Sequence, residues 1–274
     1  MKKITALLLS AMMLLTVTAC GSASSSTAPS ASAPTSSESA EPAIKSIEDL
    51  VGKKIGVQLG TTGDIYASDI KDATIEQYNK AFEAVQALSQ GKIDAVMVDD
   101  QVAKALAANN DAVTVLEEPF TVEEYALCIS KDKSDLTKDI NTAIAELKAD
   151  GTLQAILDKY IGQVEGAKGY ESPANVDRSK GTLVMATNAE FPPYEYYEGD
   201  SVVGVDAEFA KAICDKLGYE LKIEDMAFDA IIAAVQSGKA DFGAAGMTIT
   251  EERLKSIDFT DSYCTASQVI IIKK

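Results

Sequence analysis

Two absences limit the chemistry that this chain can perform. The 274 residues include no histidine, which excludes mechanisms that need imidazole as a base, a proton shuttle or a metal ligand. Cys128, Cys214 and Cys264 lack C-x-x-C or zinc spacing, so we expect small buried side chains, with one disulfide as the alternative. Residues 132–135 lack the glycine and glutamate of a calcium loop and favour helix capping, and residues 60–63 form no Walker loop. We therefore expect no metal and no cofactor.

The charge balance excludes two classes of partner. The formal net charge is −17, and such an acidic surface repels nucleic acid and anionic lipid head groups. Charged residues make up 24% of the chain and hydrophobic residues 46%, which is the ordinary balance of a globular protein with a sizeable core.

The N-terminal residues have the pattern of a targeting signal. Lys2 and Lys3 precede an apolar run over residues 4–19, which is shorter than the roughly 20 residues that span a bilayer. Residues 1–19 are therefore predicted to be a secretory signal. The sequence VTAC that ends at Cys20 resembles a bacterial lipoprotein box, with a chance cysteine beside an ordinary cleavage site as the alternative. Cys20 would carry the lipid anchor, which would include a palmitate chain. The Ser-, Ala- and Pro-rich stretch that follows completes a disordered tether over 20–45.

Beyond the tether, apolar strands alternate with amphipathic helices, which predicts an α/β fold. Strands are predicted at residues 54–58, 93–98, 113–116, 125–130, 183–186, 219–223, 241–245 and 269–272. Helices are predicted at residues 80–90, 102–108, 135–160 with a break at 150–151, 206–217 and 228–236, and a short one opens at residue 250. Glycine, proline and mixed charges mark residues 162–180 as a linker.

A similarity between two segments of the sequence indicates two similar lobes. Residues 87–96, ALSQGKIDAV, resemble residues 234–243, AVQSGKADFG. Each contains a helix end, a Gly-Lys turn and an aspartate that leads into a buried strand. Convergent turn chemistry is the alternative, but the repeated order of elements favours two related lobes.

Several segments together resemble a known family. They are ATNAEFPPY at 186–194, GVD at 204–206, GMTITEER at 246–253, DFT at 258–260, VQLGTTGD at 57–64 and DAVMVD at 94–99. The first four resemble the first lobe of the polar amino-acid-binding proteins of bacterial ABC importers, which are solute-binding proteins of family 3 with the type 2 periplasmic-binding-protein fold. The last two resemble the second lobe, which normally comes later in the chain. The reversed order indicates a circular permutation over nearly the whole mature body.

The resemblance implies two lobes, each a mixed sheet flanked by helices. One lobe would be 46–122, usually the family's second lobe. The other would combine 123–161, the hinge return and its packing helices, with 181–274, joined by the permutation linker at 162–180. The cut would fall at one hinge crossing, leaving only the crossing near 121–125 covalent. A strand over 268–274 would lie beside it, and the open state would be unusually variable.

The resemblance also implies a ligand site between the lobes. The expected members are Arg253, Asp99, Thr248, Gly246, Ala245, Thr62, Gln58, Phe191, Phe228 and Asn188. Arg253, Thr248 and backbone N–H groups near Gly246 and Thr248 would bind an α-carboxylate, with Thr62 at a helix start. Asp99 would accept from the α-ammonium, the two phenylalanines would cover the side chain, and Gln58 and Asn188 would be neutral polar contacts.

Each of these residues has a simpler interpretation. Taken alone, Arg253 suggests an arginine on the surface of a helix. Asp99 suggests a helix N-cap, a role for which Asp100 is the other candidate. Phe191 and Phe228 suggest core residues. The uncharged Asn188 and Gln58 favour a neutral amino acid, whereas Glu190, if it points inward, favours a cationic one.

The implied function is that of a monomeric, lipid-anchored extracytoplasmic binding protein. It would capture a free amino acid and deliver it to the permease and ATPase subunits of an importer, without being an enzyme. It would lie on the outer face of the cytoplasmic membrane or the periplasmic side of an envelope membrane. The alternative is a cyclohexadienyl or arogenate dehydratase-like enzyme, with Glu190 or Asp99 as the acid. A sensor module is disfavoured because no transmembrane or kinase segment follows Lys274.

Overall fold

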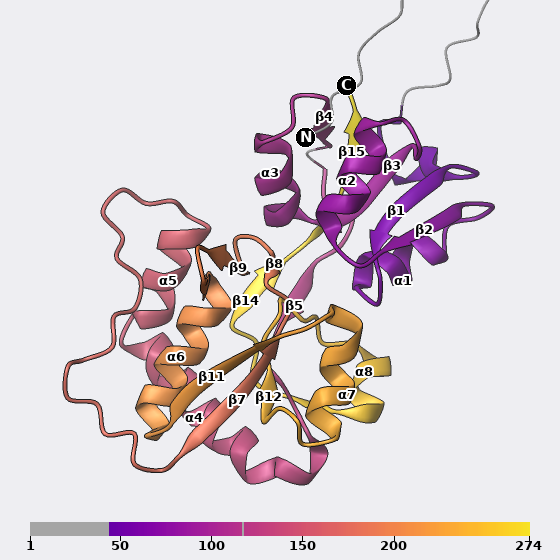
Figure 1. The fold of residues 1–274 in the computed structure, drawn as a ribbon. Coiled ribbons are helices and arrows are strands. Elements are labelled where there is room, and N and C mark those ends of the chain that lie inside the picture. The colour runs from indigo at the N-terminus through magenta and orange to yellow at the C-terminus, as the bar shows by residue number, and fades with distance from the viewer. Residues whose placement is uncertain (1–43, 117) are drawn as a thin grey trace, which may run out of the picture. The chain divides into compact units, whose positions relative to one another are not determined.

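Two five-stranded sheets organise the residues that this computed structural model describes, 44–116 and 118–274 (Figure 1). These residues belong to one unit by their contacts. The predicted signal, Cys20 and nearly all of the predicted tether lie outside the described residues. Across the described ranges, no helix has the length and apolar character needed to traverse a bilayer.

The first sheet has the order β2-β1-β3-β15-β4. Its strands are β1 (Lys54–Gln58), β2 (Thr74–Tyr78), β3 (Ala95–Asp99), β4 (Val113–Val115) and β15 (Gln268–Lys273). β1 is parallel to β2 and β3, whereas β15 is antiparallel to β3 and β4. Its helices are η1 (Ile47–Leu50), α1 (Thr62–Ser68), α2 (Ala81–Ser89) and α3 (Asp100–Ala108). We call this sheet with its helices the N-lobe.

The second sheet has the order β11-β7-β12-β6-β13. Its strands are β6 (Cys128–Ile129), β7 (Thr182–Thr187), β11 (Glu220–Asp225), β12 (Phe242–Gly243) and β13 (Asp258–Phe259). The accompanying helices are η2 (Lys131–Lys133), α4 (Ser134–Ala149), α5 (Thr152–Tyr160), α6 (Val205–Leu217), η3 (Phe228–Ala230), α7 (Ile231–Gln236) and α8 (Glu251–Ser256). A small antiparallel sheet contains β8 (Glu190–Phe191), β9 (Glu195–Glu198) and β10 (Ser201–Val203). We call these elements the C-lobe.

The chain passes between the lobes twice. β5 (Glu123–Tyr125) leads from the N-lobe to the C-lobe, and β14 (Cys264–Ala266) leads back toward β15. The two strands pair antiparallel, and we call this pair the crossing ribbon. The expectation that only the crossing near 121–125 is covalent is therefore wrong, and the C-lobe ends before residue 268 rather than at 274.

The physical reason is the apolar run within β15. Val269, Ile270 and Ile271 are buried between β3 and β4, so this strand completes the N-terminal sheet. The backbone carbonyl of Gln268 also accepts from Phe120 N at 3.2 Å, which keeps the strand beside the other crossing as expected. With both crossings covalent, the expected unusual looseness of an open state loses its basis.

The two similar segments, 87–96 and 234–243, have the same local structure in each lobe. Gly91 and Gly238 both adopt positive φ, +70° and +76°, at the turn that follows a helix. Asp94 Oδ2 then accepts from the backbone N of Lys54 at 2.8 Å, and Asp241 Oδ2 accepts from the backbone N of Val184 at 2.8 Å. In both lobes the aspartate fixes the start of the neighbouring parallel strand.

The linker expected at residues 162–180 is held against α6. Tyr170 donates from its backbone N to Glu208 Oε2 at 2.9 Å and from its hydroxyl to Asp215 Oδ2 at 2.9 Å. Arg178 Nε adds a bond to Asp215 Oδ1 at 2.6 Å. Glu208 and Asp215 are seven residues apart, so both lie on one face of the helix. They tie the linker to the C-lobe.

The longer helices and the central strands were predicted well, whereas the extent of helix α1 and the peripheral strands were not. β2 and the strands β8, β9 and β10 were missed because their residues are largely polar or partly exposed, which weakens the apolar signal. The helix predicted over 228–236 begins instead with the 3₁₀ turn η3. The break predicted at 150–151 is confirmed, with Gly151 at φ +81° between α4 and α5.

Gly204 connects two of the sequence motifs. It has φ +120°, and a Cβ atom at this position would lie 2.2 Å from the carbonyl oxygen of Tyr194. That carbonyl also accepts from Asp206 N at 2.9 Å, so the backbone cannot retreat without losing this bond. The glycine therefore allows residues 204–206 to dock on residues 193–194.

We predict that Gly204→Ala lowers the free energy of unfolding by about 3 kcal/mol, because backbone strain and the steric clash combine. Urea unfolding at constant m-value measures the change. Gly199→Ala is the matched control, since Gly199 has φ +61° in open space and should cost only about 1 kcal/mol. Equal losses for the two variants would contradict the docking role.

Candidate ligand-binding site

A small pocket lies where the N-lobe, the C-lobe and the crossing ribbon meet. Its volume is about 10 Å³. Its lining residues come from all three parts and are Thr61, Thr62, Tyr125, Phe191, Phe228, Gly246, Thr248, Arg253 and Gln268. Six of the ten expected site residues are therefore brought together: Arg253, Thr248, Gly246, Thr62, Phe191 and Phe228.

Arg253 places a buried cation in this pocket. It lies in α8, whose N-cap Thr250 accepts from Arg253 N, and it is 7% exposed. Its Nη1 donates to the carbonyl of Thr248 at 2.7 Å, and its Nη2 donates to the carbonyl of Gly60 on the N-lobe at 3.0 Å. No salt bridge to Arg253 occurs within 44–116 and 118–274. Burial lowers the pKa of Arg253, but a guanidinium stays charged, so the pocket holds a positive charge without a paired carboxylate.

Aromatic rings form the walls around this cation. The Arg253 guanidinium lies over the Phe228 ring at 5.4 Å, a cation–π geometry. Phe191 stacks on Tyr194 at 5.9 Å, and Tyr194 meets Tyr125 edge-on at 5.1 Å. Phe191 and Phe228 are both buried, so they serve the hydrophobic core and the pocket wall at the same time.

Asp99 is placed behind the pocket rather than on its surface. Its Oδ1 accepts from Gln101 N and Val102 N at 2.9 Å each, which makes it the N-cap of α3. Its Oδ2 accepts from the hydroxyls of Tyr125 at 2.8 Å and Tyr194 at 3.3 Å. The carboxylate is fully buried and does not line the pocket. The simpler interpretation as a helix cap fits this structure, and Asp100 instead pairs with Lys104.

The Gly246 peptide does not offer its N–H group to the pocket. Gly246 N donates to Asp206 Oδ2 at 2.7 Å, so the expectation of a free backbone donor there is wrong. This N–H group is occupied by the Asp206 carboxylate, which does not line the pocket. Ala245 is buried in the core cluster around Phe228 and is absent from the pocket lining.

Gln58 and Asn188 lie beside the pocket and join the two lobes. Gln58 Nε2 donates to Asn188 Oδ1 at 2.8 Å, and Asn188 Nδ2 donates to the carbonyl of Met226 at 2.9 Å. Glu190 does not enter the pocket but forms an ion pair at 2.5 Å with Lys80 of the N-lobe. These contacts, with the Arg253–Gly60 bond, connect the lobes around the pocket.

Tyr125 and Gln268 were not among the expected site residues, and they reach the pocket from the crossing ribbon and the start of β15. Gln268 Nε2 donates to Glu123 Oε2 at 2.9 Å and to Thr62 Oγ1 at 3.3 Å. Gln268 Oε1 is buried without a partner among the described residues, as is Glu123 Oε1. Because Glu123 can only accept when ionised, it fixes which end of the Gln268 amide carries the free oxygen. The sequence feature that could have indicated Gln268 is its position as a polar residue at the start of an otherwise apolar strand.

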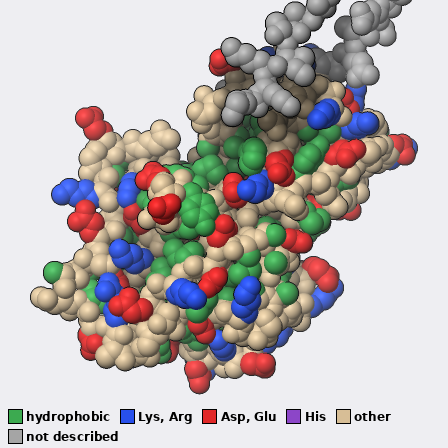
Figure 2. Space-filling view, in the orientation of Figure 1, with side chains coloured by type: hydrophobic (Ala, Val, Ile, Leu, Met, Phe, Trp, Pro, Cys, Tyr) green, Lys and Arg blue, Asp and Glu red, His purple; other side chains and the backbone are tan. Residues whose placement is uncertain are grey.

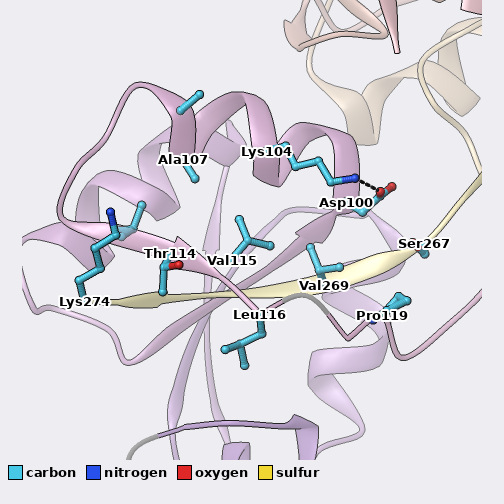
Figure 3. A pocket seen from close by; sticks show the side chains of 12 residues that line it. Asp100, Lys104, Ala107, Thr114, Val115, Leu116, Pro119, Ser267, Val269 and Lys274 are labelled. Atoms are coloured by element: carbon cyan, nitrogen blue, oxygen red, sulfur yellow. Dashed lines mark hydrogen bonds and ion pairs between the residues drawn. The ribbon is translucent and has the colours of Figure 1, made fainter. Parts of the chain in front are cut away.

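A larger cavity of about 540 Å³ lies elsewhere, on the N-lobe between α3, β4 and β15 (Figure 3). Apolar side chains such as Val115, Leu116 and Val269 line it, and its charged pair Lys104 and Asp100 bond to each other at 2.8 Å. It contains no member of the expected site. The larger volume therefore does not coincide with the expected site residues, which meet instead in the small pocket around Arg253.

Other chemistry finds little support among the described residues. No group of acidic or cysteine side chains there is arranged to hold a metal ion. Cys128, Cys214 and Cys264 are free thiols, so the alternative of a disulfide is not realised. Burial raises the pKa of each to about 12, which disfavours the reactive thiolate. On the face shown in Figure 2, acidic and basic side chains are interspersed.

Comparison with known proteins identifies the family. The sequence profile of the bacterial extracellular solute-binding proteins, family 3, matches residues 50–163 and 183–274. The chain is 45% identical over 103 residues to the arginine-binding extracellular protein ArtP of Bacillus subtilis (strain 168), which covers 38% of this chain and 40% of ArtP. It is 38% identical over 124 residues to the L-cystine-binding protein TcyJ of Escherichia coli (strain K12), covering 44% and 47%.

The chain belongs to this family of extracellular solute-binding proteins, because the profile matches most of its length. Each match spans less than half the length of the curated relative. Among solved structures, an ancestral arginine-binding protein bound to arginine is 51% identical over 30% of this chain and 36% of that chain, with a TM-score of 0.29.

We predict that Asp99→Asn removes part of the pH dependence of stability. Burial raises the pKa of Asp99 from 3.8 to about 7, so the folded protein keeps a proton that the unfolded chain releases above about pH 4. Its stabilising contribution is complete below pH 4 and is lost as the pH rises to about 7, by about 1.4 kcal/mol per unit. Asparagine can still cap α3 but does not titrate.

Urea unfolding at pH 5, 6, 7 and 8 tests this. The wild-type stability should fall more steeply between pH 5 and 7 than that of Asp99→Asn, and the two slopes should converge above pH 7. Parallel curves over the whole range would show that Asp99 is ionised in the folded protein.

Proposed function

We propose that the pocket binds a free α-amino acid through its carboxylate. The observation that carries the proposal is the Arg253 guanidinium, buried at the junction of the lobes without a carboxylate partner. A buried cation is strongly favoured to acquire an anion, and a planar guanidinium binds a carboxylate through two parallel bonds. The hydroxyls of Thr62 and Thr248 line the same pocket and supply further donors.

The ammonium group needs an acceptor that faces the pocket. We assign this role first to Gln268, whose side-chain oxygen is buried, unpartnered among the described residues and oriented by Glu123. Asp99 would act from behind, by fixing the hydroxyl of Tyr125. The ligand side chain would then extend between Phe191 and Phe228 toward Asn188 and Gln58.

Binding would require the lobes to separate and close again. The pocket volume of about 10 Å³ leaves room for about one water molecule at most, so no amino acid enters without movement. The contacts that would open are the Gln58–Asn188 bond, the Lys80–Glu190 pair and the Arg253–Gly60 bond. A ligand that contacts both lobes would shift the population toward the closed arrangement.

The proposed place of action is outside the cytoplasm, on a membrane. Lipid attachment at Cys20 and a tether over 20–45 would hold the monomeric binding body near an importer, whose permease and ATPase subunits would be its partners. Binding rather than dehydratase chemistry is favoured because the acids considered for catalysis are engaged elsewhere, Asp99 under the tyrosines and Glu190 with Lys80.

We further propose that the chain is a circular permutation of its family, with the order of lobes reversed. The support is that the family profile matches two segments separated at residues 164–182. That gap coincides with the linker bound to α6. The new ends would then fall within the N-lobe, between β15 and η1, where a buried Ile270 lines the same depression as Ser46 and Ile47.

The amino-acid ligand is tested by a thermal-shift screen of the twenty amino acids plus cystine. A ligand present at about 100 times its Kd should stabilise the protein by about 2.7 kcal/mol. Arg253→Ala should abolish the shift, because Arg253 is the one cation among the described residues that line the pocket. Arg178→Ala is the matched control, since it removes the other arginine of the chain, on the linker, and should keep the shift.

A shift that persists in Arg253→Ala would remove Arg253 from the site. The absence of any shift in the wild type across the whole screen would contradict the proposed amino-acid ligand.

The permutation is tested by reordering the chain, so that residues 182–274 are followed directly by residues 44–161. If both orders encode one fold, the reordered protein should unfold cooperatively and show the same ligand preference in the thermal-shift screen. Circular dichroism and calorimetry provide the comparison. A reordered chain that does not fold, or that binds a different ligand, would contradict the proposal.

A further inference from the structure

A second buried acid lies behind the pocket. Glu195 in β9 is fully buried, and neither of its carboxylate oxygens has a hydrogen-bond partner among the described residues. An ionised carboxylate left in this state would cost several kcal/mol, since it has lost water and gained no donor. Its position in the structure therefore requires an explanation.

The carboxyl of Asp206 in α6 lies beside Glu195, because Asp206 N donates to the carbonyl of the preceding residue, Tyr194, at 2.9 Å. Asp206 is also buried. Its Oδ2 accepts from Gly246 N at 2.7 Å, and its Oδ1 accepts from the Tyr263 hydroxyl at 2.6 Å. Neither acid forms a salt bridge within residues 44–116 and 118–274. Two adjacent acceptors without a cation can bond to each other only if one of them carries a proton.

We propose that Glu195 holds a proton, which it donates to Asp206, and that this acid pair positions the Gly246 wall of the ligand pocket. The inference rests on the proposed function, because it assigns a role in positioning the same site. Neither residue touches the pocket directly, so both are positioning residues.

The electrostatic surroundings determine which acid keeps the proton. The titratable groups that act electrostatically on the pair include Asp99 at the end of β3, Asp225 at the end of β11, Tyr194, and Tyr263 and Cys264 on the chain that enters β14. All are acidic or neutral. Burial raises the pKa of Glu195 well above its ordinary value, whereas the pKa of Asp206 rises only to about 6, because Tyr263 and Gly246 donate to it.

The pair is connected to the pocket through the backbone. Gly246 has φ +52°, and a Cβ there would lie 3.1 Å from the Phe191 ring and 3.2 Å from the Tyr125 ring. Its position between the two rings is thus fixed, and the bond to Asp206 sets the orientation of its peptide. Phe191 is in turn the ladder partner of Glu195 between β8 and β9. The pair therefore supports two neighbouring parts of the same wall.

The proton is tested by infrared spectroscopy of the whole protein without ligand. At pH 8 the Asp99→Asn variant, in which Asp99 cannot contribute a protonated carboxyl, should show the carbonyl stretch of a buried protonated carboxyl, and Asp99→Asn combined with Glu195→Gln should lose it. The absence of this band in the Asp99→Asn variant, or its persistence in the double variant, would overturn the proton assignment. The result does not depend on whether an amino acid binds, so it separates this inference from the proposed function.

The positioning role is tested by calorimetric affinity for the amino acid that the screen identifies. Glu195→Gln retains an N–H donor to Asp206 and should bind within about threefold of the wild type. Glu195→Met has similar size but no donor and should bind at least tenfold more weakly. Equal affinities of the Gln and Met variants would overturn the positioning role.

Should Glu195→Met fail to fold, Asp206→Asn decides the same point. Its neutral amide is a weaker acceptor for both Gly246 and Glu195, so its affinity should fall at least tenfold. Unchanged affinity would overturn the proposal. In either variant, the amide resonance of Gly246 should shift in an NMR spectrum before any ligand is added.

Discussion

The arrangement of the site depends on one unpaired charge. Arg253 is held in the C-lobe by the Thr248 carbonyl, reaches the N-lobe through the Gly60 carbonyl, and lies against the face of Phe228. Carbonyl dipoles and a ring quadrupole stabilise a buried guanidinium only partly, and no acid neutralises it among the residues described. The hydroxyl groups and aromatic rings of the pocket surround a guanidinium whose charge is only partly neutralised.

The acidic side chains near Arg253 do not pair with it, because each of them bonds to another partner. Asp99 caps α3 under two tyrosine hydroxyls, and Glu190 pairs with Lys80. Asp206 accepts from Gly246 and Tyr263. In an acidic chain, the charge of a buried arginine stays uncompensated only if the nearby carboxyl groups are neutral or bonded to other partners. The buried network behind the pocket achieves this without placing a second cation in the core.

The sequence predicted those parts of the molecule that follow from local patterns. The alternating strands and helices, the Gly-Lys turns and the pocket positions of Arg253, Thr248 and Phe191 correspond to short motifs. The place of Asp99 could not be predicted, because an aspartate after a strand serves equally as a cap or a ligand contact, and Tyr125 and Tyr194 decide between them from distant segments. The sheet of β15 was also missed, since an apolar run fits either lobe until its neighbours β3 and β4 are known.

The crossing ribbon restricts how the lobes can move. Its strands pair at three successive positions, from Cys264 with Tyr125 to Ala266 with Glu123, immediately beneath the pocket. Sliding one strand past the other would break this ladder, whereas bending across its face leaves the hydrogen bonds intact. Bending of the ribbon is therefore the deformation that keeps all three of its paired positions, and a displacement of one lobe would be transmitted to the other through this short ladder.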